Sequence, residues 1–317
     1  MSSEHPLIPV IVGPTAGGKT ELAICVAELL TRTTGRPAEI ISADSVQIFR
    51  GMDIGSAKPS PEERRGIPHR LIDIVEPEDR YTVHQWLTDA ERAIDDIRAR
   101  GGLPIVVGGT HLYIKALLDG LFEGPEPDPA LRDRLASRSL SELRSELEQI
   151  DPAAAARIHP NDRRRTVRAL EIFHQTGTPI SVFQTQWDRA HPRRSDLFVF
   201  ALHWPSELIN RRINARVRSM VEAGLVDEVR TLAPRLGEQA CQALGYKQLL
   251  ASIRGHIPQD EAIELIKIET RRFAKNQRTW LKRLARGPAY RGFLLTGPPG
   301  REESQSIVQQ CLMWTPT

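Results

Sequence analysis

The segment GPTAGGKT constrains the fold of this chain more than any other part of its 317 residues. It matches the pattern G-x-x-x-x-G-K-S/T and lies between an apolar, β-branched run, residues 7–12, and a helical pattern, residues 19–30. In this arrangement, N–H groups of a glycine-rich turn and a helix N-terminus converge on phosphate oxygens. Lys19 adds positive charge, and the Thr20 hydroxyl can bind Mg²⁺. We therefore predict a diphosphate-binding loop that consists of Gly13, Pro14, Thr15, Ala16, Gly17, Gly18, Lys19 and Thr20.

Short apolar runs recur along the chain, with helical patterns between most of them. The predicted strands cover residues 7–12, 39–42, 71–75, 104–107 and 197–202. Strands that alternate with helices indicate a mainly parallel sheet with helices on both faces, so we predict an α/β fold with a P-loop NTPase-like core. A long amphipathic helix is predicted over residues 206–232, and further helices follow to about Arg286.

The alternation stops in the middle of the chain. Residues from about 126 to 195 have helical periodicity and helix-forming residues but no convincing strand. We therefore predict a core made of residues 1–125 and 196–317, interrupted by a small all-helical insertion domain over residues 126–195.

Charge and cysteine usage limit the classes of function. The net charge of +3 is too small to indicate a nucleic-acid partner, but basic residues gather at 157–168 and 267–286. Each stretch is either a phosphate-facing surface or a solvated helix face. Cys25, Cys241 and Cys311 have neither a metal-ligand spacing nor a disulfide framework, so we expect buried, reduced thiols. No secretory leader and no apolar run of ~20 residues are evident, so a cytoplasmic protein without membrane contact is expected, a monomer by default.

Two further strand ends carry polar side chains. A phosphate loop alone does not distinguish hydrolysis, phosphoryl transfer and reactions in which diphosphate is the leaving group. Motor-type nucleotidases usually also have an apolar strand that ends in Asp-Glu. No predicted strand ends that way here, which argues against ATP hydrolysis. The second strand leads into Asp44, which could be a base, a turn cap or a Mg²⁺ ligand at the carboxyl edge of the sheet. The fourth leads into Gly108-Gly109-Thr110, where Thr110 could contact a substrate or only cap a helix.

Six segments resemble one family, the tRNA dimethylallyltransferases, in the family's order and spacing. They cover GPTAGGKT and residues 41–59, 107–121, 156–173, 214–229 and 243–249, so the resemblance extends over nearly the whole chain. It implies transfer of a dimethylallyl group from dimethylallyl diphosphate to the exocyclic amine of the adenine on the 3′ side of the anticodon in tRNA, with release of diphosphate. It also implies catalytic roles for Asp44, which accepts a proton from the amine, and Thr110. The same resemblance implies that Arg216 binds the diphosphate.

The resemblance further implies contacts with the anticodon stem-loop of tRNA, which the helical insertion would grip. The implied tRNA-binding residues are Asp44, Ser45, Val46, Gln47, Thr110, Arg132, Arg164, Arg165, Thr166, Val167, Arg168, Gln242, Ala243, Leu244, Gly245, Tyr246 and Lys247. Lys19, Arg216, the loop amides and Mg²⁺ would stabilise the leaving diphosphate while Asp44 removes the proton.

The late basic stretch lies in a predicted helix over about 266–284. Its apolar positions Ile266, Phe273, Trp280 and Leu284 have helical spacing, so we expect that stripe to be core and only the basic face to meet RNA. Two positions depart from the pattern of the family: Phe49 replaces a usual tyrosine, and Asn276 a common basic residue. Neither belongs to the expected catalytic set.

Three other functions are compatible with parts of the sequence. A small-molecule P-loop kinase would use the same loop on ATP, but it does not explain the Asp44 and Thr110 segments together. A free adenine-nucleotide isopentenyltransferase would need less of a stem-loop grip than the long basic insertion offers. A non-catalytic RNA-binding protein would not need an intact Lys19 and Thr20.

Overall fold

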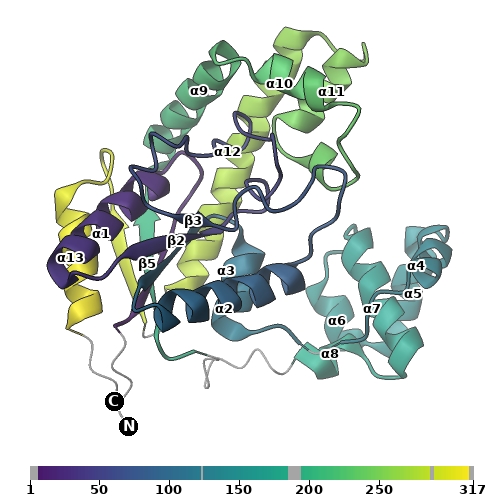
Figure 1. Ribbon diagram of the computed structural model, residues 1–317. Helices are drawn as coiled ribbons and strands as arrows, with labels where there is room; N and C mark the ends of the chain where they lie inside the picture. Colours follow the sequence, from purple (N-terminus) through teal and green to yellow (C-terminus); the bar gives the residue numbers. More distant parts are fainter. Residues whose placement is uncertain (1–5, 123, 185–193, 286–288, 314–317) are drawn as a thin grey trace. The chain divides into compact units, whose positions relative to one another are not determined.

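The computed structural model describes residues 6–122, 124–184, 194–285 and 289–313 (Figure 1). The chain divides into two compact units. The core unit comprises Met1–Leu118 and Arg194–Thr317, and the helical unit comprises Asp119–Arg193. The insertion expected over 126–195 overlaps the helical unit but begins later than it.

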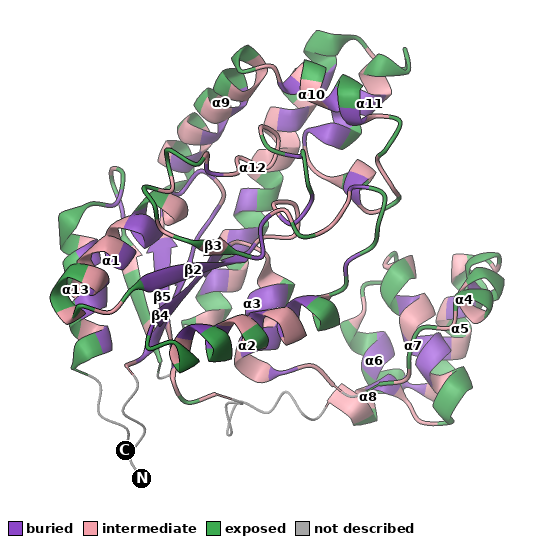
Figure 2. Cartoon of the chain, in the orientation of Figure 1, coloured by how far each residue is buried: buried purple, intermediate pink, exposed green. Residues whose placement is uncertain are grey.

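The core unit is built on a six-stranded, entirely parallel sheet. Its strands are β1 (Ile8–Val12), β2 (Ala38–Ala43), β3 (His69–Arg70), β4 (Leu103–Gly108), β5 (Leu197–His203) and β6 (Tyr290–Leu294), in the order β3-β2-β4-β1-β5-β6. Every residue of β1, β2 and β4 is buried, as expected for parallel strands covered on both faces (Figure 2). The predicted α/β class with a parallel sheet is confirmed.

Helices cover this sheet and extend from it. They are α1 (Lys19–Thr34), α2 (Val83–Ala99), α3 (His111–Asp119), α9 (Ser206–Glu222), α10 (Leu225–Leu232), the short 3₁₀ helix η2 (Ala240–Gln242), α11 (Tyr246–Ile253), α12 (Gln259–Leu284) and α13 (Arg301–Leu312). The helix α1 packs against β2, β4 and α13, whereas α2 packs against β2 and β4.

Two predicted elements were wrong. Residues 71–75 do not form a strand: β3 ends at Arg70, Leu71 and Asp73 have φ values of 60° and 56°, and Val75 forms only an isolated bridge to Phe49. The helix predicted over 206–232 is two helices, because Gly224 adopts a φ of 100° between α9 and α10. The edge strand β6 and the helix α13 were missed.

The three cysteines are free, but the expectation that all are buried was wrong. Cys311 is buried in α13, whereas Cys25 and Cys241 are partly exposed.

The helical unit has a hydrophobic core of its own. Its helices are α4 (Pro129–Ala136), α5 (Leu140–Ile150), α6 (Pro152–Arg157), α7 (Arg163–Thr176) and α8 (Ile180–Phe183). Side-chain oxygens of Asp128, Ser139, Asp151 and Asp162 cap four of these helices. The core consists of Leu135, Leu143, Leu147, Ala154, Ala155, Ala169, Leu170, Ile172 and Ile180.

Close packing fixes the strand ends that face the site. Trp86 of α2 is fully buried, donates from its indole N–H to the carbonyl of Ser42 at 3.0 Å, and stacks on Tyr113 of α3 at 4.6 Å. A Cβ at Gly108 would lie 2.1 Å from the carbonyl oxygen of Ala43, so only glycine lets β4 approach β2 at this point. The segments after β2 and β4 are therefore held side by side.

Candidate active site

A cavity of about 330 Å³ opens where the carboxyl ends of β1, β2 and β4 meet, the edge at which such sheets bind ligands. It brings together predicted residues from five separate segments. These lining residues are Thr15, Ala16, Lys19, Thr20, Asp44, Ser45, Val46, Gln47, Thr110, Arg216, Gln242, Ala243, Leu244 and Gly245. Tyr246 is buried and Lys247 is exposed, and neither lines the cavity.

A second cavity of about 640 Å³ adjoins the other side of the phosphate loop. Gly17 and Gly18 line it, and Lys19, Thr20 and Arg216 line both cavities. Lys19, Thr20 and Arg216, all among the residues predicted to bind the diphosphate, therefore lie between the two spaces.

Neighbouring side chains orient the peptide groups of the loop. Trp204 donates from its indole N–H to the carbonyl of Gly17 at 3.2 Å, and Arg212 donates from Nε to the carbonyl of Ala16 at 2.8 Å. The Arg212 guanidinium also lies over the Trp204 ring at 4.8 Å. Because the C=O and N–H of a trans peptide point in opposite directions, fixing the Gly17 carbonyl also fixes the direction of the Gly18 N–H.

Lys19 is tuned by its surroundings. Its ammonium donates to the carbonyl of Pro14 at 2.9 Å. Burial lowers the pKa of Lys19 to about 8; Asp44 opposes this shift and Arg216 adds to it. Burial likewise lowers the pKa of Arg216 below its ordinary value. Two cations held partly out of water next to a phosphate loop favour an anionic ligand, because such a ligand compensates for their lost hydration.

Asp44 and Thr110 meet at the strand ends. Oδ1 of Asp44 accepts hydrogen bonds from the N–H groups of Val46 at 2.9 Å and Gln47 at 3.3 Å, so this oxygen is a turn cap. Its second oxygen forms no hydrogen bond with any residue that the structure describes, although Lys19 and Arg216 interact electrostatically with the carboxylate. Thr110 Oγ1 accepts from the Ser45 N–H at 3.0 Å and donates to Ser45 Oγ at 3.2 Å. The turn-cap reading and the base reading of Asp44 are therefore compatible, because they use different oxygens.

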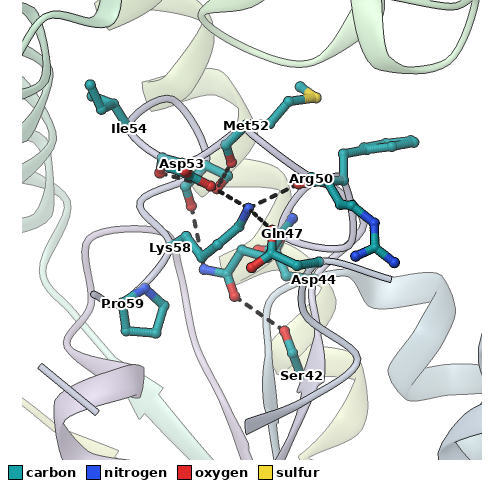
Figure 3. A network of polar contacts seen from close by, with 12 residues as sticks. Ser42, Asp44, Gln47, Arg50, Met52, Asp53, Ile54, Lys58 and Pro59 are labelled. Atoms are coloured by element: carbon teal, nitrogen blue, oxygen red, sulfur yellow. Dashed lines mark hydrogen bonds and ion pairs between the residues drawn. The ribbon is translucent and has the colours of Figure 1, made fainter. Parts of the chain in front are cut away.

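A polar network around the buried Lys58 side chain shapes the loop after β2 (Figure 3). The Lys58 ammonium donates to the Phe49 carbonyl at 2.9 Å and pairs with Asp53 at 2.5 Å and Asp73 at 2.6 Å. Gln47 accepts from the Ser42 hydroxyl and donates to the carbonyls of residues 56 and 57. The Gln47 amide, expected to contact tRNA, is thus used within this loop.

Glu228 of α10 holds the same loop from the other side. Its carboxylate accepts from the N–H groups of Asp53, Ile54 and Gly55 and from the Tyr246 hydroxyl at 2.6 Å. Burial and Glu228 raise the pKa of Tyr246 far above its ordinary value, so the phenol stays protonated. Tyr246 therefore supports the cavity wall through Glu228.

The helix α12 contributes differently from the prediction. Phe273 is 38% exposed and lines the cavity, and Trp280, which stacks on His111 at 4.6 Å, and Leu284 are only partly buried, so the stripe predicted as core was wrong at these three positions. The buried positions are Ala262, Ile266, Ala274, Gln277 and Leu281. Hydrophobicity of the residue types could not distinguish the buried face of α12 from its exposed face, because Gln277 lies on the buried face and Phe273 on the exposed one.

His111, the first residue of α3, is neutral at pH 7. Burial lowers its pKa to about 4, with a further contribution from Lys19. Its Nε2 is buried and has no hydrogen-bond partner among the residues that the structure describes. Near neutral pH the imidazole therefore adds no positive charge beside Lys19.

Several supporting residues were missed by sequence reasoning: Lys58, Trp204, Arg212, Glu228, Phe273 and Gln277. Apart from Lys58, whose partners lie within 15 residues of it, each acts together with residues from distant segments of the chain, so no local spacing reveals it.

In the helical unit the predicted residues differ in exposure. Arg132 and Arg168 both pair with Glu171, which is fully buried, and Thr166 bonds back to the carbonyl of Asp162. Arg164 and Arg165 are exposed, and Val167 packs against the unit's core. Arg164 and Arg165 are therefore the members of the set that are open to a partner.

No described helix is both long and apolar enough to cross a bilayer. Over the described ranges, no cluster of three or more His, Cys, Asp or Glu side chains could hold a metal by itself. The fold and the site together define a P-loop protein whose loop, with Lys19 and Arg216, borders a cavity that is lined in part by apolar side chains.

Comparison with known proteins is specific. An IPP transferase family profile matches residues 47–284. The tRNA dimethylallyltransferase of Pelotomaculum thermopropionicum is 46% identical over 294 residues, 89% of this chain and 90% of that protein. The Symbiobacterium thermophilum protein of the same name is 44% identical and covers 94% of this chain and 92% of its own length.

Solved structures agree. The full-length tRNA isopentenylpyrophosphate transferase of Bacillus halodurans matches with a TM-score of 0.69 and 37% identity over 96% of this chain and 95% of that chain. A eukaryotic dimethylallyltransferase, crystallised in the course of acting on tRNA, matches with a TM-score of 0.77 and 30% identity over 90% of this chain and 73% of that chain. The chain belongs to the IPP transferase family.

Proposed function

We propose that this protein transfers a dimethylallyl group from dimethylallyl diphosphate to the exocyclic amine of the adenine on the 3′ side of the anticodon in tRNA. Relatives that carry this activity in their names match nearly the whole chain. The observation that carries the proposal is the meeting of Lys19, Arg216, Asp44 and Thr110 around one cavity.

The reaction breaks the allylic carbon–oxygen bond and forms a carbon–nitrogen bond. The leaving diphosphate takes the bonding electron pair, and Lys19, Arg216 and the amides of the loop stabilise its charge. Asp44 accepts the proton that the amine loses, on the oxygen that does not cap the turn. Thr110, held by Ser45, orients the acceptor.

Mg²⁺ fits this arrangement as an ion carried by the diphosphate. Mg²⁺ favours oxygen ligands, and it commonly keeps several waters and binds through substrate phosphates and one or two protein groups. Thr20 supplies such a hydroxyl where the two cavities meet. When bound, the ion would neutralise charge on the diphosphate, and Thr20 is the residue that would hold it.

The acceptor base lies in an RNA loop and must leave its stack to reach a closed cavity. Apolar side chains such as Phe273, Val217 and Met220 line one part of the cavity and leave room for the prenyl group or the base. Among the helical-unit arginines predicted to contact tRNA, Arg164 and Arg165 are the exposed ones, and they would contact the stem-loop.

The test is incubation of the purified protein with Mg²⁺, unmodified tRNA and radiolabelled dimethylallyl diphosphate. Label should appear in tRNA and be lost with Asp44→Asn. Parallel reactions contain labelled ATP or adenine mononucleotide. Label found only in the mononucleotide would indicate a free-nucleotide transferase, and phosphate transfer from ATP without prenyl transfer would indicate a kinase.

A further inference from the structure

The helix α12 brings one neutral amide to the phosphate loop. Gln277 is only 2% exposed. Its Oε1 accepts a hydrogen bond from the Thr15 N–H at 2.8 Å, and its Nε2 donates to the Gly109 carbonyl at 3.0 Å. This side chain therefore joins the loop after β1 to the turn after β4.

Both bonds together require a primary amide. The Thr15 N–H needs an acceptor and the Gly109 carbonyl needs a donor, so the two partners also fix which way round the amide lies. An ionised carboxylate lacks the donor, and an aliphatic side chain of the same size lacks both groups. Because the junction is partly buried, an unmade bond leaves a backbone group without compensation.

The junction is also closely packed. A Cβ at Gly109 would lie 2.5 Å from Nε2 of Gln277 and 3.5 Å from both the Gly13 carbonyl oxygen and the Lys19 ammonium. The glycine therefore allows the turn, the loop and the amide to come together. A small displacement of Gln277 changes the distance between the cation that meets the diphosphate and the turn that carries Thr110.

We propose that Gln277 is a positioning residue for group transfer, which sets the diphosphate loop at a fixed distance from the turn that carries Thr110. In this role it acts through the two peptide groups that it holds. It also occupies the Thr15 N–H, so phosphate is bound by the remaining N–H groups of the loop. The inference rests on the proposed function, because it concerns the alignment of a leaving diphosphate with an acceptor amine.

The expected signature is a loss of turnover without a matching loss of donor binding. Replacing Gln277 removes none of the groups that bind diphosphate, which are Lys19, Arg216 and the remaining N–H groups of the loop. The alignment of the leaving diphosphate with the acceptor amine does change, and a misplacement by about 1 Å can lower the rate by a factor of about 100. A residue that only stabilised the fold would lower the amount of folded protein and leave the kcat of that fraction unchanged.

The test compares Gln277→Met with Gln239→Met in the full-length protein. Gln239 is a matched control, because its amide accepts from the Tyr81 N–H at 2.9 Å and donates to the Tyr81 carbonyl at 3.1 Å, away from both cavities. For Gln277→Met we expect kcat to fall about 10- to 100-fold, while KM for dimethylallyl diphosphate changes by less than about 3-fold. For Gln239→Met we expect an unchanged kcat.

Hydrogen exchange of the peptide that contains residues 13–20 gives a second readout, independent of prenyl transfer. Exchange should be faster in Gln277→Met than in wild type or Gln239→Met, and inorganic diphosphate should restore part of the protection. If Gln277→Met does not fold, Gln277→Glu takes its place, since it keeps the acceptor for Thr15 but loses the donor for Gly109.

Wild-type kcat and wild-type loop exchange in the Gln277 variant would overturn the proposal, as would equal losses of kcat in the two methionine variants. If the wild-type protein itself transfers no prenyl group, the proposed function fails. In that case the exchange measurement alone decides whether Gln277 holds the loop.

Discussion

At the scale of single residues, individual atoms of the candidate site differ in what they bind. Asp44 uses one carboxylate oxygen to cap its own turn, and the proposed proton transfer needs only the other. Lys19 has its pKa lowered by burial but stays mostly charged at neutral pH. In each case the backbone geometry fixes the side chain, and the local environment sets its chemistry.

Asp44→Asn should lower kcat about 100-fold or more, because the amide cannot take the proton from the adenine amine. The fold of the turn should survive, since the Asn carbonyl oxygen can still accept from the Val46 and Gln47 N–H groups. Single-turnover transfer of labelled dimethylallyl groups measures the first effect, and tRNA binding by filter retention measures the second. Full turnover in this variant would remove Asp44 from its catalytic role.

The affinity for dimethylallyl diphosphate should fall as the pH rises through about 8. Below that pH the Lys19 ammonium of the free protein is charged; above it, a proton must be taken up before the charge can meet the diphosphate. Between pH 7 and 9 the dissociation constant should rise about 10-fold, as isothermal titration calorimetry can measure. Lys19→Met should bind weakly with little pH dependence over this range, and an equally steep dependence in that variant would assign the titration to another group.

At the scale of elements, α12 serves three surfaces at once. One face is core, Gln277 reaches the phosphate loop, and the outer face forms a groove of about 420 Å³ with α9. Arg271, Arg272, Lys275, Arg278 and Lys282 line this groove. A helix of this length can combine such roles because residues at different angular positions face different neighbours.

Replacing Lys275 and Lys282 by glutamate should weaken tRNA binding and reduce its salt dependence. The slope of log K against log salt should fall by about one for each lysine that binds an RNA phosphate in the wild-type protein. Filter binding at several salt concentrations measures this slope, and the affinity for dimethylallyl diphosphate serves as the internal control. An unchanged slope would mean that this groove is a solvated helix face.

At the scale of the whole molecule, the helical unit has its own core and is built around a buried charge. Glu171 is fully buried and accepts from Arg132, Arg168 and the Asp128 N–H. Two of the arginines expected to contact tRNA are thereby tied to the interior of this unit. Their substitution would disturb its fold as well as any contact with RNA.

Glu171→Gln should destabilise the helical unit by about 3 kcal/mol, because two partly buried arginines lose their common carboxylate. Hydrogen exchange should speed up in α4 and α7 but not in the sheet of the core unit. The matched control is Glu148→Gln, which alters an exposed carboxylate paired with Arg144 and should cost less than about 1 kcal/mol. Equal exchange rates in the two variants would show that the buried carboxylate does not hold the unit together.

Much of the core unit, its buried strands and its phosphate loop, was determined by the sequence itself. Buried parallel strands need apolar runs, and a phosphate loop needs glycine, lysine and a hydroxyl in fixed order, so β1, β2, β4 and β5 and the loop could be predicted from local pattern. The break at Gly224 and the two-residue strand β3 could not, because an isolated glycine is compatible with a helix and so short a strand has no periodicity. The edge strand β6 is largely exposed and carries no apolar run.

The individual candidates of the site came from the sequence, but only the tertiary structure decided how they are held. Asp44, Thr110 and Arg216 follow from motif and resemblance, whereas Gln277 lies 262 residues from its partner Thr15 and Trp204 lies 187 from Gly17. Local pattern carries no information about such pairs, because a buried amide is recognisable only once its donor and acceptor are in place. The sequence by itself determined the phosphate loop and the strands that present it; the folded chain decided which side chains fix that loop against the rest of the site.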